Sequence, residues 1–425
     1  MLSKEQIKQI LVSQRESLLN KPFGIERTLL KEIKAKKNFP HVIVITGIRR
    51  CGKSTLLKQI IEKLYDNKDF YYINFEDERL FNFEAQHFND IYESLIELYG
   101  ECKTFFIDEI QNIDNFETFV RRFYDRGFKF YITGSNARML STEIGTKITG
   151  RHLDIVVKPF SFEEFLKLKN FTLKKNMLYL TEKRVQIKKL FEEFLLKGGM
   201  PEYLLYNDIE ILTLIYEDIL IKDIMVRYHI DNIATLREVY HYLINNFSNR
   251  FSYNSIKNIL NVGSVNTVKK YISHLEETFF AKTIPKFDHS VKKQLVNDKK
   301  LYLLDNGFIQ AISTRLTEDK GWLLENIIFN VFNQQFVDVF YVSNKNECDF
   351  VTLKNKKVTS VIQVTWELNE TNRKRELEGL LEAMDYFHQH NGLLLTYDQE
   401  DEIIKDDKKI IIKPVWKWLL EQKSD

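Results

Sequence analysis

The sequence predicts an α/β protein in which a parallel sheet comes first, a helical region follows, and a second α/β unit comes last. From residue 41, four apolar runs (VIVIT, FYYINF, TFFID and FKFYITG) alternate with helical stretches, which is typical of a parallel sheet covered on both faces. Residues 166–300 have mostly helical periodicity, and strand-like runs return from about residue 301. We therefore predict three domains, at residues 1–165, 166–300 and 301–425.

The composition of the 425 residues is that of a folded chain with few breaks. Hydrophobic residues make up 44% and charged residues 29%, which excludes an intrinsically disordered protein. Only 15 glycines and 6 prolines are present, which excludes collagen-like and flexibly strung architectures. The formal net charge of +2 neither requires nor excludes a nucleic-acid partner, because a local basic patch can be hidden in a neutral total.

The distribution of cysteine and apolar residues predicts a cytoplasmic protein. The three cysteines lie far apart and lack metal-ligand spacing, which indicates free thiols in a reducing compartment. The first 17 residues are interrupted by charge every few positions and lack the apolar core of a signal peptide. No apolar run approaches the ~20 residues that a membrane span needs, so we expect no membrane partner.

A phosphate-binding loop is predicted at residues 47–54. The segment matches GxxxxGK[ST], and it lies after the run VIVIT and before a predicted helix at 55–64, as such a loop must. The alternative, a chance glycine-rich turn, is disfavoured because strand, loop and helix are in register. Lys53 would reach the β- and γ-phosphates, and Ser54 would ligate Mg²⁺. The expected nucleotide-binding residues are Gly47, Ile48, Arg49, Arg50, Cys51, Gly52, Lys53, Ser54 and Thr55.

Two acidic residues, Asp108 and Glu109, follow the apolar run TFFI. This order places their carboxylates at the carboxyl end of a buried strand, beside the phosphate loop. Asp108 would hold Mg²⁺, and Glu109 would polarise the attacking water. An acidic helix cap after a strand is the alternative, but the neighbouring loop favours the functional interpretation. The presence of the second acid favours hydrolysis over a slow nucleotide switch.

Two further polar residues are candidates for catalysis. The predicted strand at 128–133 runs into Gly134-Ser135-Asn136, and a polar side chain at that tip can touch the γ-phosphate or the water. We prefer Asn136, followed by Ser135, although the tripeptide GSN is also a common turn. Arg151 could act as an arginine finger, with a surface ion pair as the alternative.

Several motifs resemble a known family. In chain order, GIRRCGKSTLL, YYINFEDERL, FFIDEIQNI, YITGSNARML, TGR and PFSFEEFL resemble AAA+-like P-loop ATPases that carry a DUF4143 C-terminal region. KGGMPEYLL and KDIMVRYHI resemble the middle section of the same family, so the resemblance covers nearly the whole chain. It implies a P-loop NTPase sheet of the ASCE type with Walker A and Walker B motifs, and it implies ATP and Mg²⁺ as ligands. Because such ATPases often complete their sites across subunit boundaries, the resemblance also allows a homo-oligomer in which Arg151 acts in trans.

The middle region is predicted to contain a winged helix-turn-helix. Helices at 236–246, 253–260 and 265–279 precede a candidate wing strand at 280–287, and Ser264 is the expected N-cap of the third helix. Lys and Asn side chains suit phosphate and base-edge contacts, so this helix could contact DNA. The candidate residues for this contact are Asn266, Thr267, Lys269 and Lys270. The alternative is a lid or a protein-docking module, because Glu276 and Glu277 dilute the positive face.

The last domain resembles the restriction-endonuclease-like fold. Its PD-(D/E)xK site uses an acid on the first helix, an acid on a strand and E/Q-x-K on the next strand. Glu325, Asp349 and Gln363 match these positions, whereas Thr365 replaces the lysine and cannot supply its positive charge. Lys374 and Arg375 are less favoured substitutes. We expect a nuclease-like module with a degraded site, kept for structure or for binding.

Together these patterns predict an ATP-binding, Mg²⁺-dependent P-loop ATPase whose nucleotide cycle controls engagement of DNA or of a protein partner. One alternative is an ATP-regulated DNA nuclease that uses the C-terminal site. Another is a nucleotide-gated interaction module with little turnover.

Overall fold

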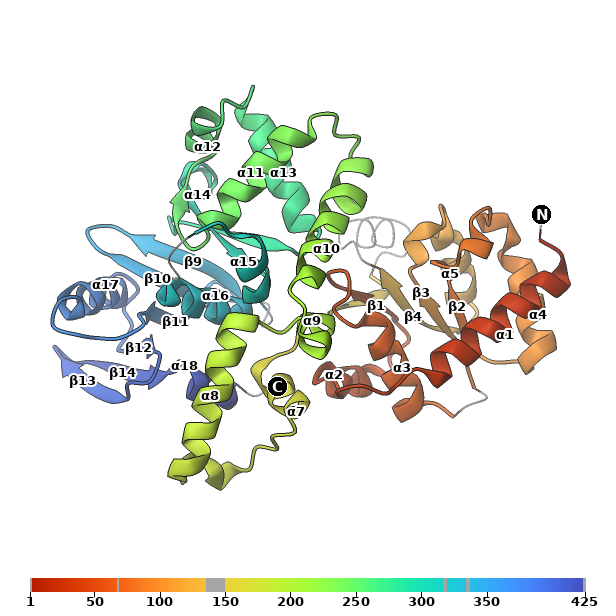
Figure 1. The fold of residues 1–425 in the computed structure, drawn as a ribbon, viewed down its shortest axis with the longest axis horizontal. Helices are drawn as coiled ribbons and strands as arrows, with labels where there is room; N and C mark the ends of the chain where they lie inside the picture. The colour runs from red at the N-terminus through yellow and green to blue at the C-terminus, as the bar shows by residue number, and fades with distance from the viewer. Residues whose placement is uncertain (1, 67–68, 135–149, 316–318, 334–336, 423–425) are drawn as a thin grey trace. The chain divides into compact units, whose positions relative to one another are not determined.

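The computed structural model describes residues 2–66, 69–134, 150–315, 319–333 and 337–422. The contacts between residues divide the chain into two compact units (Figure 1). The first unit comprises residues 1–159 and 277–279, and the second comprises residues 160–276 and 280–425. The predicted middle and C-terminal domains fall together in the second unit, and the division into three domains stays a prediction. Among the helices of the described residues, none combines the length and the apolar character needed to cross a membrane.

A five-stranded parallel sheet with the order β2-β3-β4-β1-β5 forms the centre of the first unit. Four strands were predicted: β1 Val42–Thr46, β2 Tyr71–Asn74, β3 Thr104–Asp108 and β4 Lys129–Gly134. The fifth, β5 His152–Val156, was not, because this edge strand has one buried residue and no continuous apolar run. The helices of this unit are α1 Lys4–Asn20, α2 Leu29–Lys36, α3 Lys53–Leu64, α4 Phe88–Tyr99 and α5 Phe116–Tyr124, with 3₁₀ turns Glu78–Leu80, Ala85–His87 and Ile110–Asn112.

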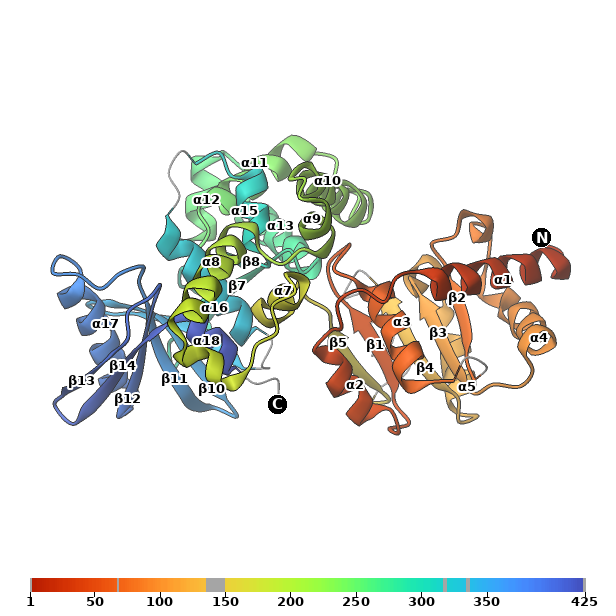
Figure 2. The same cartoon turned by 60° about the horizontal axis from the view of Figure 1, so that its bottom comes forward.

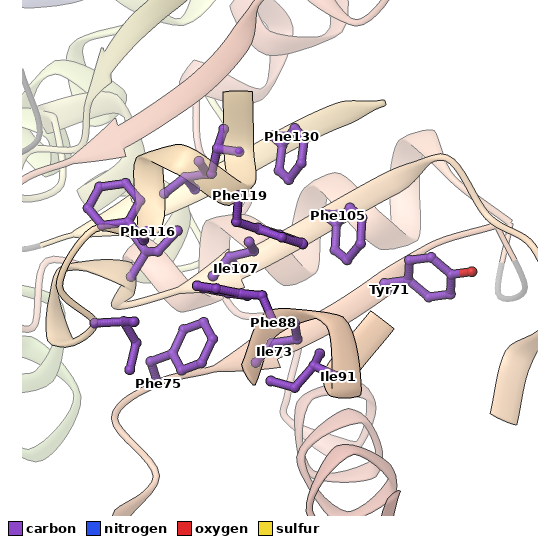
Figure 3. Close-up of a cluster of buried hydrophobic side chains, with 14 of the residues drawn as sticks. Tyr71, Ile73, Phe75, Phe88, Ile91, Phe105, Ile107, Phe116, Phe119 and Phe130 are labelled. Atoms are coloured by element: carbon purple, nitrogen blue, oxygen red, sulfur yellow. The ribbon is translucent and has the colours of Figure 1, made fainter. Parts of the chain in front are cut away.

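Aromatic side chains dominate the core between one face of this sheet and helices α1, α4 and α5 (Figure 3). Phe105 stacks on Phe130 with ring centroids 5.2 Å apart, and Phe88 stacks on Phe119 at 4.2 Å. Because side chains alternate along a strand, the neighbouring residues of β3 and β4 face the other side, where α3 packs. Both faces of the sheet are therefore covered, as the apolar runs predicted.

The second unit contains the helix and strand order predicted for a winged helix. Helix α11 Ile233–Asn245, strand β6 Arg250–Phe251, helices α12 Tyr253–Ile259 and α13 Val265–Glu277, and strands β7 Ala281–Pro285 and β8 Lys299–Leu303 follow one another. The strands form an antiparallel sheet with the order β6-β8-β7. The Ser264 hydroxyl accepts the Thr267 backbone N–H at 3.1 Å, so the predicted N-cap is confirmed.

Strand β8 corrects one expectation. We placed the run KLYLLD at the start of the C-terminal domain, but its residues pair with β6 and β7 instead. All five residues of β8 are buried, as expected for the central strand of a sheet. The three-stranded sheet and the segment that follows it are therefore continuous through β8.

The C-terminal part contains a six-stranded sheet with the order β13-β14-β12-β11-β10-β9. Helix α16 Lys320–Phe332 precedes three antiparallel strands, and α17 Arg373–Tyr386 then leads to the parallel strand β12 and packs on β10, β11 and β12 (Figure 2). The order of these elements is the one expected from the sequence, and the nuclease-like description itself stays a prediction. The strands are β9 Asp338–Ser343, β10 Glu347–Lys354, β11 Lys357–Val364, β12 Asn391–Thr396, β13 Asp401–Lys405 and β14 Lys408–Pro414.

Short helices connect these parts of the second unit. A tight turn predicted at Gly198 and Gly199 separates two of them, and Gly198 has φ +71°, where a Cβ would collide with the carboxylate of Asp305. The Gly199 N–H donates to that carboxylate at 2.6 Å, so the turn is held by a buried acid 106 residues away. The connecting helices are α7 Phe162–Leu168, η4 Lys175–Tyr179, α8 Thr181–Lys197, α9 Pro201–Tyr206, α10 Glu210–Asp218, the π-helix Ile219–Val226, α14 Val291–Val296, α15 Asn306–Ile312 and α18 Val415–Glu421.

Truncation of the aromatic core should destabilise the first unit. We expect Phe119→Ala to lower the free energy of unfolding by about 3–5 kcal/mol, because it removes a buried ring and leaves a cavity. This loss is measured by urea denaturation, with hydrogen exchange of the backbone amides in the first unit as the readout. The matched control is Phe81→Ala, whose ring is 88% exposed and whose removal should change stability by less than about 0.5 kcal/mol. Equal effects of the two substitutions would contradict the described packing.

Candidate functional site

The phosphate loop lies between β1 and α3, as predicted. Gly47 has φ +146°, and a Cβ there would lie 2.2 Å from the Val157 carbonyl oxygen. Gly52 has φ +97°, and α3 begins at the next residue. Both glycines are therefore required by the backbone, which then presents the free N–H groups of a helix N-terminus to an anion.

Lys53 is buried at the base of this loop. Its ammonium lies 3.2 Å from the carbonyl oxygen of Gly47, 3.3 Å from that of Ile48 and 3.6 Å from a carboxylate oxygen of Glu109. The side chain is 6% exposed. The structure thus brings the predicted phosphate-binding lysine and the predicted water-polarising acid into direct contact.

Thr133 connects the two acidic residues and was missed by sequence reasoning. Its hydroxyl donates to Oδ1 of Asp108 and accepts the backbone N–H of Glu109 at 2.9 Å. Burial raises the pKa of Asp108 and Glu109 raises it further, while hydrogen bonds from Thr133 and Ser54 act in the opposite direction. The signal was present in the pattern, because the strand predicted at 128–133 ends at Thr133, and β4 lies beside the acidic strand β3.

Arg27 is a second residue that sequence reasoning missed. Its guanidinium donates to the carbonyl oxygens of Cys51 at 2.9 Å and Lys158 at 2.5 Å, so it joins the phosphate loop to the end of β5. Its own N–H donates to Gln59 of α3 at 3.0 Å. The Gln59 amide in turn donates to the carbonyls of Phe23 and Ile25. The segment before α2 is therefore tied to the phosphate loop through one buried arginine.

The remaining catalytic candidates are not assembled at this site in the described residues. Ser135 and Asn136 lie outside the residues that the structure describes. Arg151 directly precedes β5, and the first residue of β5 pairs with the first residue of the parallel strand β1. Arg151 therefore lies at the amino ends of these strands, whereas the phosphate loop follows the carboxyl end of β1. Its guanidinium is 2.6 Å from Asp125. The surface ion pair is thus the arrangement within this chain, and the arginine-finger role stays a prediction for a neighbouring subunit.

The residues at the loop fit a nucleotide with Mg²⁺. Ser54 hydrogen-bonds to Asp108, so a hydroxyl and a carboxylate lie together below the loop. Oxygen donors of these two kinds are the ligands that Mg²⁺ prefers, usually with phosphate oxygens and water completing the set.

The predicted DNA-contacting face is largely accessible. Asn266, Lys269 and Lys270 are exposed on α13, whereas Thr267 is half-buried and bonds to Ser264. The Lys269 ammonium lies 5.4 Å from the centre of the Tyr253 ring. Contact with DNA through this face stays a prediction.

A cavity of about 530 Å³ in the second unit collects the three predicted nuclease-site residues. Glu325 comes from α16, Asp349 from β10 and Gln363 from β11. The side-chain carbonyl oxygen of Gln363 accepts the Asp349 N–H at 3.3 Å, and its amide donates to Glu376 at 2.7 Å. Sequence reasoning therefore found residues that the fold does bring together.

The positive charge in this cavity comes from Lys300, which was missed. Its ammonium lies 2.9 Å from Glu325, 2.7 Å from Glu347 and 3.2 Å from Asp349, and the side chain is 3% exposed. Burial alone lowers the pKa of Lys300, but the surrounding acids, Glu325 foremost, raise it well above its usual value. Within the described residues, no group of three acidic, histidine or cysteine side chains is arranged to hold a metal ion.

The other lysine substitutes considered from the sequence behave differently. Thr365 donates its hydroxyl to the Glu367 carbonyl oxygen at 3.2 Å. Lys374 is 85% exposed and pairs with Glu378 on its own helix. Arg375 lines the cavity and pairs with Glu376 at 2.5 Å.

The sheet order, the loop and the paired acids define the first unit as a P-loop nucleotide-binding domain. A family model described as an AAA domain matches residues 40–166, and one described as a domain of unknown function, DUF8612, matches residues 188–320. The DUF4143 region that we expected is not shown. The chain is 35% identical to protein MJ1544 of Methanocaldococcus jannaschii over 97% of this chain and 99% of that one, so it belongs to the family of that protein.

Other similar proteins extend the comparison. A Haemophilus influenzae protein is 29% identical over 92% of this chain and 97% of its own length; both relatives are described only as uncharacterized. Among solved structures, a mutant of Thermotoga maritima RuvB has 14% identity over 66% of this chain and 90% of that one, with a TM-score of 0.30. AMPPCP-bound DnaA from Aquifex aeolicus has 18% identity over 59% and 86%, with a TM-score of 0.24. At these scores the two structures carry no argument about function.

Removal of the Thr133 hydroxyl should impair hydrolysis more than nucleotide binding. A hydrogen bond to a charged group contributes about 1.5–3 kcal/mol, so Thr133→Val should lower kcat for ATP by about 10- to 100-fold. Thr133→Ser retains the hydroxyl and is the matched control. Steady-state hydrolysis and equilibrium ATP binding separate the two effects. An unchanged kcat in Thr133→Val would show that Asp108 and Glu109 are positioned without it.

Loss of the Arg27 guanidinium should loosen the phosphate loop. Arg27→Met removes both carbonyl contacts, and we expect ATP affinity to fall about tenfold, equivalent to about 1.4 kcal/mol. Arg27→Lys should recover part of the affinity, because an ammonium keeps the positive charge but lacks the planar fork of donors with which the guanidinium bonds both carbonyls. The control is Arg121→Met, an exposed arginine of the same unit. Equal ATP affinity in Arg27→Met and Arg121→Met would remove Arg27 from the site.

Proposed function

We propose that this protein is a Mg²⁺-dependent ATPase whose nucleotide cycle controls its engagement of DNA or of a protein partner. The observation that carries the proposal is the contact of Lys53 with Glu109, 3.6 Å apart, beside Asp108 at the carboxyl end of β3. A phosphate-binding lysine, a metal-binding acid and a water-polarising acid are the parts that ATP hydrolysis requires.

Each residue has a stated task in this proposal. Ser54 and Asp108 would hold Mg²⁺, which neutralises charge on the β- and γ-phosphates when bound. Lys53 exchanges its two carbonyl partners for phosphate oxygens, which are stronger acceptors for an ammonium. Glu109, oriented by Thr133 through its backbone N–H, accepts a proton from water. Asn136 would sense the γ-phosphate, and Arg151 would act in trans in a homo-oligomer.

The winged-helix order of elements supports engagement of a partner. The exposed face of α13 presents Asn266, Lys269 and Lys270, whose side chains suit a phosphate backbone. A protein partner is the alternative occupant, because Glu276 and Glu277 lie on the same helix. We also propose a cytoplasmic location, from the cysteine pattern.

The C-terminal unit is proposed as a nuclease-like module with a degraded site. An ATP-regulated DNA nuclease is the second candidate function, and it is favoured by the gathering of Glu325, Asp349 and Gln363 in one cavity. Thr365 argues against it, because it replaces the lysine that the predicted motif has on β11, and the ammonium found in the cavity comes from Lys300 on β8 instead. A nucleotide-gated interaction module with little turnover is the third candidate.

The proposed activity is tested by ATP hydrolysis with and without DNA. Lys53→Ala should abolish ATP binding and turnover, and Glu109→Gln should bind ATP yet hydrolyse it at least about 100-fold more slowly. The control is Lys63→Ala, on the same helix, whose side chain is 52% exposed. Radiolabelled phosphate release measures turnover, and filter binding measures affinity.

The outcomes separate the three candidates. Stimulation of turnover by DNA supports the ATPase that engages DNA. Normal ATP affinity with no turnover, with or without DNA, points to the interaction module. Metal-dependent DNA cleavage that disappears in Asp349→Ala establishes the nuclease. Wild-type protein that binds no ATP would contradict all three.

A further inference from the structure

The positive charge in the cavity around Lys300 comes from a different sheet than the strands that carry Asp349 and Gln363. Lys300 lies on β8 of the winged-helix sheet, and Arg250 stands directly opposite on β6. Like charges at opposed positions of a sheet repel each other. Both side chains nevertheless point to one acid: Lys300 binds one carboxylate oxygen of Glu347 at 2.7 Å, and Arg250 binds the other. The shared acid offsets the repulsion and holds both cations at the cavity.

The carboxylates of this cavity already have protein donors. Glu325 accepts from Lys300 at 2.9 Å and from the Tyr302 hydroxyl at 2.5 Å through the same oxygen. One oxygen of Asp349 accepts from Lys300 at 3.2 Å, and the other accepts the Val364 backbone N–H at 3.0 Å. Lys300 is the donor that Glu325 and Asp349 share, so a divalent cation bound by both acids would have to displace its ammonium.

The Lys300 ammonium occupies a position that would suit a metal ion. It lies within 3.2 Å of oxygens from three carboxylates that come from α16 and β10. In the restriction-endonuclease-like fold that this part resembles, acids on the first helix and on a strand hold a divalent ion, and such an ion activates water. An ammonium has three N–H donors and no coordination position for water, so it can neutralise the acids but cannot activate a nucleophile.

We propose that Lys300 permanently occupies the cation position of this cavity, so that the native site excludes divalent metal, and that loss of its ammonium opens a divalent-cation site on Glu325, Glu347 and Asp349. The contacts of Lys300 carry this inference by themselves. Its interpretation as a nuclease site without metal rests on the proposed function of the C-terminal part. The cavity then keeps the acids of the predicted nuclease-like site without the metal that cleavage requires. Its three acids stabilise Lys300 and, through β8, connect the winged-helix sheet to the C-terminal sheet.

The test uses the full chain with Mn²⁺ as the metal probe. No nucleotide is added. We expect about 1 mM Mn²⁺ to raise the Tm of Lys300→Met by about 5 °C and that of the wild type by less than about 1 °C, because a ligand stabilises only the state that binds it. Electron paramagnetic resonance should show one additional bound Mn²⁺ in the variant. The matched control is Lys299→Met on the same strand, whose ammonium bonds to the Gln294 carbonyl oxygen and does not line the cavity.

A second pair of variants keeps the result decisive. Lys300→Met/Asp349→Asn should lose the additional Mn²⁺, which assigns the metal to this cavity rather than to the phosphate loop. Lys300→Met leaves buried acids unpaired and could fail to fold. In that event Lys300→Met/Glu325→Gln, which carries one acid fewer, is compared with the wild type, and folding that depends on Mn²⁺ supports the proposal.

Three results would overturn the inference. Mn²⁺ bound equally by wild type and Lys300→Met would show that the ammonium excludes nothing. No additional Mn²⁺ in any Lys300 variant would show that the acids form no metal site. Metal-dependent DNA cleavage by the wild type that is lost in Lys300→Met would make Lys300 the working lysine of a nuclease. ATP hydrolysis is measured in parallel, and its absence in both proteins would bear on the proposed ATPase and not on Lys300.

Discussion

The parallel pairing of β1, β3 and β4 is the constraint on which the nucleotide site depends. The register places Thr46 beside Gly134 and Ile107 beside Ile132, so the phosphate loop, the acidic pair and Thr133 emerge at one edge of the sheet. A shift by one residue would move the aromatic side chains of β3 and β4 to the wrong face. The aromatic core therefore sets the register, and the register brings the chemical groups together.

Local patterns were sufficient to predict the centre of the first unit. The four apolar strands, the loop and the acid pair each lie within a short segment whose residue types indicate their structure. The edge strands β5 and β13 could not be predicted in this way, because HLDIV has one buried residue, DEIIK has none, and neither has a continuous apolar run. Their strand conformation is decided by pairing with β1 and β14. The pairing of β8 with β6 and β7 escaped prediction for the same reason, since composition does not reveal which strands pair.

The site residues that escaped prediction act through contacts distant in sequence. Thr133 bonds to an acid 25 residues away, Arg27 to a carbonyl 131 residues away, and Lys300 to an acid 49 residues away. No spacing rule links these pairs, because the sheets and helices between them determine which side chains meet. Arg151 was selected from its neighbours in sequence, and the pairing of β5 with β1 places it at the end of the sheet away from the loop of its own chain, so its role in a neighbouring subunit stays a prediction.

The two buried lysines differ in what holds them, and this difference separates an exchangeable charge from a fixed one. Lys53 has two neutral carbonyl oxygens near 3.2 Å and one carboxylate at 3.6 Å. Phosphate oxygens are stronger partners than these carbonyls, so a nucleotide can displace them. Lys300 has three carboxylates within 3.2 Å, and removing it would leave their charges buried and uncompensated. A ligand can therefore recruit the first ammonium, whereas the second is held as part of the fold.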